Sequence, residues 1–199
     1  MGFSPLIEQL IESLRCLPGV GQKTAQRMAF HLINNDKTGA GQLAEVMQKA
    51  IEQIDHCTVC RNLCEHEICD YCASPSRDDA ILCIVESPAD VLIVDKATQF
   101  KGKYFVLMGH LSPLDGVGPE ELGLAMLGQR FDNKLIKEVI LATNPTVEGE
   151  ATAHYISEMA AKRKIKATRL AHGVPLGGEL EYIDGNTLSH AFSDRREIL

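Results

Sequence analysis

The sequence lacks several features that define large classes of proteins. No run of apolar residues approaches the roughly 20 that a membrane-spanning helix needs, and residues 1–5 lack the basic start and apolar stretch of a secretory signal. The pattern Gly-x-x-x-x-Gly-Lys-Ser/Thr is also absent, so nucleotide hydrolysis has no support. Five of the seven cysteines lie close together, which argues against a disulfide framework and for a reducing compartment. We therefore expect a cytoplasmic protein with no membrane partner.

The charge of the chain is unevenly distributed. The 199 residues are 45% hydrophobic and 24% charged, the composition of an ordinary globular protein, and the formal net charge is −7. A negative net charge by itself argues against a nucleic-acid partner. Between residues 15 and 37, however, the sequence has Arg15, Lys23, Arg27 and Lys37 against a single acid, Asp36. The N-terminal segment can therefore present a locally basic face.

Two Cys-x-x-Cys pairs predict a metal centre in the middle of the chain. Each pair places two thiolates on one side of a tight turn, and two pairs complete a tetrahedral zinc site with Zn–S bonds of about 2.3 Å. The predicted ligands of one structural zinc ion are Cys57, Cys60, Cys69 and Cys72. Four thiolates leave no open position, so the metal would hold the fold together. A substitute ligand stays possible, because Cys64, His56 and His66 lie between or beside the pairs.

The N-terminal segment is expected to contain three helices. Apolar residues recur at three- and four-residue spacing over residues 6–14, and Ser4-Pro5 precedes them as N-cap and first helical position. A short glycine hairpin follows, and then a second apolar face over residues 25–33. Residues 34–41 read as a polar loop, and residues 43–54 as a third helix whose apolar stripe is core or a subunit contact.

The start of the second helix is a candidate DNA-binding site. Gly19 and Gly21 allow close backbone approach, and the first amides of a helix are available to a phosphate. Lys23 and Arg27 lie four residues apart, hence on one face. With Ala25, this segment resembles the helix-hairpin-helix motif, which implies contacts that position DNA without reading its sequence. The alternative is a plain pair of helices with glycine as a C-cap.

The second half of the chain alternates strands with helices. Continuous apolar runs predict strands over residues 81–85, 104–108 and 139–143, with a fourth over residues 166–171. Ser87-Pro88 begins a helix after the first strand, and another helix spans about residues 150–162. This alternation predicts a parallel sheet with helices on both faces.

Acidic residues follow two of these predicted strands. Glu86 and Asp90 come after the first, and Glu148 and Glu150 after the third, so all four are expected at one edge of the sheet. Acids that are brought together need a divalent cation such as Mg²⁺ or a basic partner. The alternative is that they are solvated loop residues.

The pattern over residues 80–175 resembles the Toprim domain of topoisomerases, primases and certain nucleases. Catalytic Toprim domains carry Asp-x-Asp in their second motif, whereas this chain has Glu148-Gly-Glu150, which puts catalysis in doubt. Residues 179–184 are expected to form a short strand ending in an acid, loosely similar to a Walker B strand. A last short helix is expected over residues 188–192.

In this order, the segments resemble the RecR family of bacterial recombination mediators. The most specific pieces besides the cysteines are residues 17–21, 109–118 and 142–153. The resemblance implies an α+β multi-module fold with four parts: a helix-hairpin-helix segment (1–54), a four-cysteine zinc finger (55–76), an α/β Toprim domain with a central parallel sheet (79–175) and a Walker-B-like tail (176–199).

The family resemblance also implies a function. Its members are non-catalytic DNA-repair proteins that form ring-like oligomers, commonly tetramers, and act with RecO and RecF to load RecA onto gapped single-stranded DNA. Lys23 and Arg27 would then face single- or double-stranded DNA, and the four acids would meet a basic partner such as RecO. The competing hypothesis is a Mg²⁺-dependent Toprim nuclease or primase-like enzyme.

Overall fold

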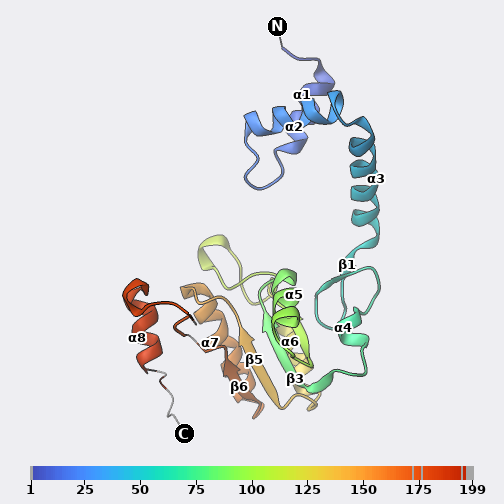
Figure 1. Cartoon of the computed structure of the whole chain (residues 1–199). Coiled ribbons are helices and arrows are strands. Elements are labelled where there is room, and N and C mark those ends of the chain that lie inside the picture. The colour runs from blue at the N-terminus through green and yellow to red at the C-terminus, as the bar shows by residue number, and fades with distance from the viewer. Residues whose placement is uncertain (1, 172, 176, 194, 196–199) are drawn as a thin grey trace. The chain divides into compact units, whose positions relative to one another are not determined.

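The structure is a computed structural model that describes residues 2–171, 173–175, 177–193 and 195. The chain divides into two compact units, residues 1–54 and 55–199, and each is described here by itself (Figure 1). Among the helices of the described residues, none is long and apolar enough to cross a membrane.

The first unit consists of three helices. They are α1 (Pro5–Leu14), α2 (Gln22–Asn34) and α3 (Lys37–Gln53). Ser4 and Pro5 begin α1 as predicted. Helices α1 and α2 pack through Ile11, Ala25 and Ala29, which are all buried. The small side chain of Ala25, fully enclosed, allows the close approach of the two helices.

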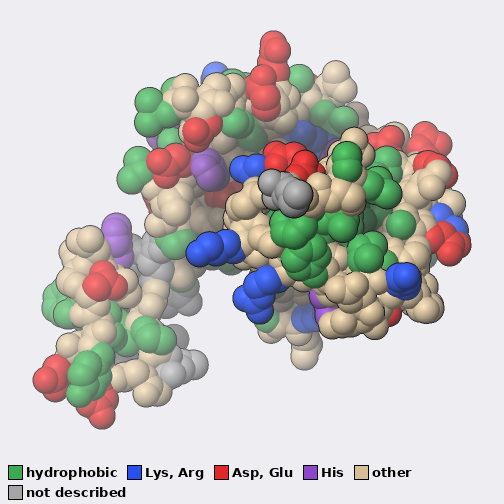
Figure 2. Space-filling model, turned by 90° about the horizontal axis from the view of Figure 1, so that it is seen from above, with side chains coloured by type: hydrophobic (Ala, Val, Ile, Leu, Met, Phe, Trp, Pro, Cys, Tyr) green, Lys and Arg blue, Asp and Glu red, His purple; other side chains and the backbone are tan. Residues whose placement is uncertain are grey.

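Helix α3 begins earlier than predicted and buries none of its residues. The polar loop expected over residues 34–41 is confined to Asn35 and Asp36, because the Asp36 side chain caps the helix by accepting a hydrogen bond from the Gly39 amide (2.8 Å). The apolar side chains of α3 are 47–79% exposed: Leu43, Val46, Met47 and Ile51. Figure 2 shows hydrophobic side chains at the surface of the molecule among charged ones.

The second unit begins with a small module that carries the cysteines. Its regular elements are β1 (Asp55–His56), β2 (Leu63–Cys64) and α4 (Asp70–Ala73). Strands β1 and β2 are antiparallel neighbours of two residues each. Elements this short supply little cohesion of their own, so the module depends on other contacts for its shape.

The centre of the second unit is a four-stranded, all-parallel sheet, as the sequence predicts. Its strands are β3 (Asp78–Val85), β4 (Gly102–Val106), β5 (Glu138–Ala142) and β6 (Lys166–Arg169), in the order β4-β3-β5-β6. Leu82 on the central strand pairs with Lys103 on one side and Val139 on the other.

Helices cover both faces of the sheet, again as predicted. On one face lies α5 (Pro88–Ala97), where Val91 packs against Val85, Tyr104 and Val106. The other face carries α6 (Leu124–Asp132) and α7 (Val147–Ala161). These two helices and the sheet enclose the larger apolar core, which includes Leu82, Ile84, Phe105, Leu127, Phe131 and Ile156.

Two boundaries near the sheet edge differ from the sequence prediction. Strand β4 ends at Val106 rather than at residue 108, because Met108 adopts a left-handed backbone (φ +62°). Helix α7 begins at Val147 rather than at residue 150, since the Thr146 hydroxyl accepts a hydrogen bond from the Gly149 amide (3.0 Å). Glu148 and Glu150 therefore both lie in the first turn of α7.

The remaining elements are short. A 3₁₀ turn, η1 (Pro113–Asp115), lies in the loop between β4 and α6. The strand predicted over residues 179–184 is wrong: this segment forms the 3₁₀ turn η2 (Leu180–Tyr182). The predicted final helix is confirmed as α8 (Gly185–Ser193).

Candidate metal centre and nucleic-acid interface

The structure brings the four predicted cysteine ligands together. One Sγ atom from each of Cys57, Cys60, Cys69 and Cys72 lies within 4.8 Å of all the others. A tetrahedral site with Zn–S bonds of about 2.3 Å has sulfur atoms about 3.8 Å apart. Three of the four side chains are buried and the fourth is half-buried. The donor set and its spacing therefore fit one structural zinc ion.

The alternative ligands take other roles. The Cys64 thiol donates a hydrogen bond to the His66 carbonyl (2.8 Å), and the His56 ring lies beside Asp55 with its side chain 52% exposed. Within the described part of the chain, the four cysteines are the only group of three or more His, Cys, Asp or Glu ligands close enough to hold a metal.

The thiols of the centre do not ionise alike. The hydrogen bond between Cys60 and Cys72 lowers the pKa of Cys72 to about 6, and the nearby Arg130 guanidinium acts in the same direction. Burial raises the pKa of Cys69 to about 11. The thiolate is the form that binds metal, so Cys72 is prepared for zinc, whereas Cys69 would release a proton on binding it.

Buried cations join the cysteine module to the sheet. Lys103 on β4 donates hydrogen bonds to the carbonyls of Tyr71 (3.3 Å), Cys72 (2.9 Å) and Ser74 (2.7 Å). Its side chain is only 5% exposed. Arg130 on α6 donates to the Tyr104 carbonyl (2.8 Å). A zinc ion with four thiolates carries net negative charge, and Arg130, which interacts electrostatically with Cys72 and Cys60, lies where it can compensate it. The charge partner of Lys103 is Asp79 on β3, at 3.7 Å.

The cysteine module also contacts the sheet through its own backbone. The Cys60 carbonyl accepts a hydrogen bond from the Val106 amide of β4 (2.8 Å). Arg61, in a left-handed conformation (φ +65°), donates to the carbonyls of Leu107 (3.1 Å) and Glu121 (2.8 Å). The metal centre is therefore part of the same packed unit as the sheet.

The glycine hairpin of the first unit has the geometry expected of a phosphate site. Gly19 has a φ of +76°, which favours glycine, and Gly21 is the N-cap of α2. A Cβ built on either glycine meets no atom within 4 Å. Lys23 and Arg27 are exposed on α2. The free amides at the start of α2, the open space over the glycines and the two cations together suit a phosphate backbone.

Glu86 lies at the sheet edge but is buried. It is 6% exposed and accepts hydrogen bonds from the Asn144 amide (2.8 Å) and the Asn144 side-chain nitrogen (2.7 Å). The ring nitrogen Nδ1 of His110 also lies 3.4 Å from Oε2 of Glu86. Glu86 thus fixes the loop that connects β5 to α7. The partners Asn144 and His110 lie far away in sequence, and sequence reasoning missed them.

The other three acids have separate positions. Asp90 forms a capping box with Ser87 at the start of α5. Glu150 is paired with Arg169 at the end of β6, and Glu148 is exposed in the first turn of α7. In the described residues, no three of the four acids come close enough together to form a metal site.

A helix-hairpin-helix unit, a four-cysteine metal centre and a helix-covered parallel sheet define a modular protein of the Toprim class. Family models agree: "RecR, helix-hairpin-helix" matches residues 7–51, "Toprim domain" residues 80–171, and "RecR, C-terminal" residues 173–196.

Full-length relatives make the assignment specific. Recombination protein RecR of Methylococcus capsulatus is 60% identical over 192 residues, which cover 96% of this chain and 97% of that protein. Recombination protein RecR of Saccharophagus degradans is 58% identical over 196 residues, 98% of this chain and 100% of that protein. The chain belongs to the RecR family, and the resemblance stated from the sequence is confirmed.

The metal centre can be tested with a pair of cysteine substitutions. Cys72→Ser should reduce bound zinc below one ion per chain and lower the melting temperature, because it removes a ligand that holds the module together. Cys64→Ser is the matched control and should retain the zinc. Metal analysis after gel filtration gives the stoichiometry. Full zinc in Cys72→Ser, with loss in Cys64→Ser, would show that the ligand set is different.

The contact of Glu86 with Asn144, which we call the Glu86 clamp, leaves no room for a side chain at Gly149. A Cβ there would lie 2.1 Å from the Asn144 carbonyl oxygen and 3.1 Å from Glu86 Oε1. Gly149→Ala should therefore destabilise the second unit by about 1–3 kcal/mol, the usual cost of overpacking. Gly128→Ala on α6, where a Cβ makes ordinary 3.5 Å contacts, is the control and should not destabilise it. Equal urea midpoints for both variants would contradict the clamp.

Proposed function

We propose that this protein is a non-catalytic, DNA-binding recombination mediator in cytoplasmic DNA repair. In this proposal it forms a ring-like clamp that acts with RecO and RecF to promote RecA loading on gapped single-stranded DNA. The observation that carries the proposal is the open start of α2 with Lys23 and Arg27 exposed beside it. The names of its relatives, which are recombination proteins, support the same role.

The helix-hairpin-helix unit supplies the DNA contact in this proposal. The amides at the start of α2, Lys23 and Arg27 all address phosphate groups, which every sequence and both single- and double-stranded DNA share. Binding is therefore expected without sequence preference. Since the whole chain is acidic, the basic face of α2 would direct DNA to this unit.

The exposed apolar face of α3 supports the assembly. Leu43, Val46, Met47 and Ile51 are too exposed to be part of the core of the first unit. Apolar side chains grouped on one helix mark a contact surface. We assign a second copy of this chain to it, as part of a homotetramer.

The first turn of α7 supports a partner surface for RecO. Glu148 and Glu150 project acidic groups there, while the buried Glu86 and the capping residue Asp90 hold the neighbouring loops in place. A basic partner would neutralise the exposed Glu148 and extend the existing pair of Glu150 with Arg169. The competing nuclease or primase-like enzyme is less favoured, since Glu86 is already engaged by Asn144 and His110.

The DNA contact predicts a defined loss. Replacing Lys23 and Arg27 together with alanine should weaken DNA binding and lower the slope of log K against log salt by roughly 1.4–1.8, because each phosphate contact contributes roughly 0.7–0.9. Fluorescence anisotropy over a salt series measures both quantities. Lys96→Ala, an exposed lysine on α5, is the control. An unchanged slope would remove α2 from the DNA interface.

The partner surface predicts a different pattern. Replacing Glu148 and Glu150 with glutamine should weaken the complex with RecO while DNA binding by the isolated protein stays at the parental level. Calorimetric titration with RecO and anisotropy with DNA are the two measurements. Loss of DNA binding with an intact RecO complex would count against this surface.

A further inference from the structure

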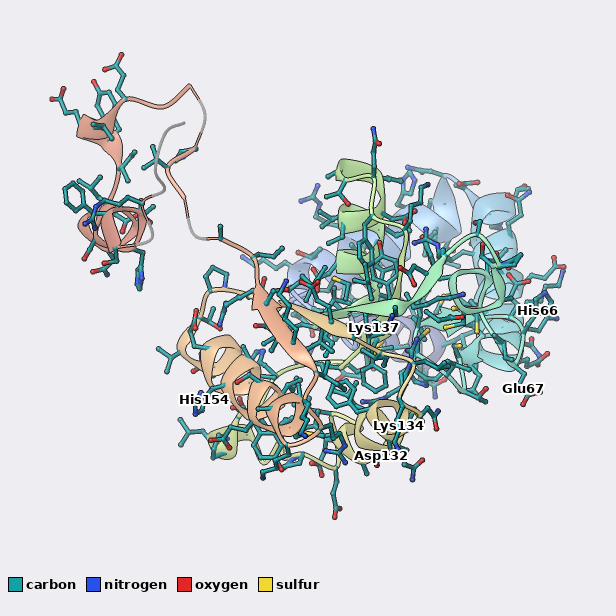
Figure 3. All side chains as sticks on the ribbon, turned by 90° about the horizontal axis from the view of Figure 1, so that it is seen from below. His66, Glu67, Asp132, Lys134, Lys137 and His154 are labelled. Atoms are coloured by element: carbon teal, nitrogen blue, oxygen red, sulfur yellow. The ribbon has the colours of Figure 1, made fainter. Side chains whose placement is uncertain are left out.

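Basic residues are concentrated at the edge of the sheet where the strands begin, opposite the edge that carries Glu86. They lie in two short connections, one between α6 and β5 and one between α7 and β6, and at the first residue of β6. We call this set the edge patch: Lys134, Lys137, Lys162, Arg163, Lys164 and Lys166. Figure 3 labels Asp132, Lys134 and Lys137, which lie between the end of α6 and the start of β5.

Most of the positive charge in the edge patch is not neutralised. Asp132 pairs with Arg163 (2.7 Å), and Glu138 pairs with Lys166 (3.4 Å). The remaining members are the exposed residues Lys134, Lys137, Lys162 and Lys164. No carboxylate of the described residues lies within ion-pair distance of any of these four. This surplus occurs in a chain whose net charge is −7, so it is not the general character of the surface.

Two of the lysines occupy backbone positions that favour glycine. Lys134 has a φ of +57° just after α6, and Lys164 has a φ of +59° just after α7. At such helix ends the left-handed residue is usually glycine or asparagine. A lysine there carries a conformational cost. Attraction to the helix C-terminus recovers part of that cost. The occurrence of lysine at both of these positions indicates that the positive charge there has a function.

The edge patch surrounds a hollow of about 370 Å³. Lys134, Lys137, Arg163 and Lys164 line it together with one acid, Asp132, which is paired with Arg163. Phe131, Ile136 and Ile165 contribute apolar lining. Ammonium groups on flexible stems around such a depression suit successive phosphates of a polyanion. Glu86, Asp90, Glu148 and Glu150 follow the C-terminal ends of strands, away from this hollow. The nearby acids Asp132 and Glu138 are paired with Arg163 and Lys166.

We propose that the edge patch binds the sugar–phosphate backbone of DNA, as a second contact besides that of α2. The proposal rests on the proposed function for the choice of DNA as the polyanion. Lysine carries a compact ammonium group and not the planar, forked guanidinium with which arginine recognises bases. The lysines of the edge patch therefore fit contacts with the backbone rather than base recognition. The second unit would thus hold DNA through its own surface.

The backbone conformation permits a test that separates charge from stability. Lys134→Gly combined with Lys164→Gly removes two charges and introduces the residue that each φ favours. The full-length variant should melt at the parental temperature or above it. Its affinity for gapped DNA should fall, and its salt slope should decrease by roughly 1.4–1.8. Lys96→Ala on α5 is again the control for loss of a surface lysine.

The outcomes distinguish this proposal from the proposed function. Parental affinity and slope in the double glycine variant would overturn the edge patch, while an effect of the Lys23 and Arg27 substitutions would leave the α2 contact standing. Reduced binding in the glycine variant, with no effect of the Lys23 and Arg27 substitutions, would support the edge patch and overturn the α2 contact. If the glycine variant melts lower, Lys134→Asn with Lys164→Asn repeats the test with another residue that tolerates this conformation. Parental binding by a stable asparagine variant would equally overturn the patch.

Discussion

The second unit depends on one buried charge, the ammonium group of Lys103. Its three hydrogen bonds end on carbonyls of the cysteine module, and its own strand, β4, forms one side of the sheet. A buried ammonium is tolerated only where it is fully hydrogen-bonded and meets opposite charge. The cysteine module supplies the hydrogen bonds, and Asp79 of β3, whose Oδ1 lies 3.7 Å from Lys103 Nζ, supplies the opposite charge, so the cysteine module and the sheet stabilise each other through this one side chain.

The parallel sheet determines where chemistry can occur. All four strands run in the same direction, so the loops that follow them meet at one edge and the loops that precede them at the other. Glu86 and the first turn of α7 lie at the former, and the edge patch lies at the latter.

Much of this architecture could be predicted from the sequence, because local patterns carry it. Apolar spacing located α1 and α2, and the cysteine spacing located the metal ligands. The early starts of α3 and α7 were missed because single side chains, Asp36 and Thr146, cap them. The contact of Glu86 with Asn144 joins residues 58 positions apart, and no local pattern encodes it. The prediction of a strand over residues 179–184 was wrong, because an extended segment needs a neighbouring strand to pair with.

The separation of charge along the strands has a consequence for motion in solution. The exposed Lys134, Lys137, Lys162 and Lys164 at one edge and the exposed Glu148 at the other separate unlike charges, and an external field such as that of a nucleic acid exerts a torque on such a separation. Screening limits this torque to distances of about 10 Å at 0.1 M salt. Within that range, the unit would arrive with its lysines leading and its glutamates turned outward, so that landing on a polyanion leaves the acidic end available to a second protein.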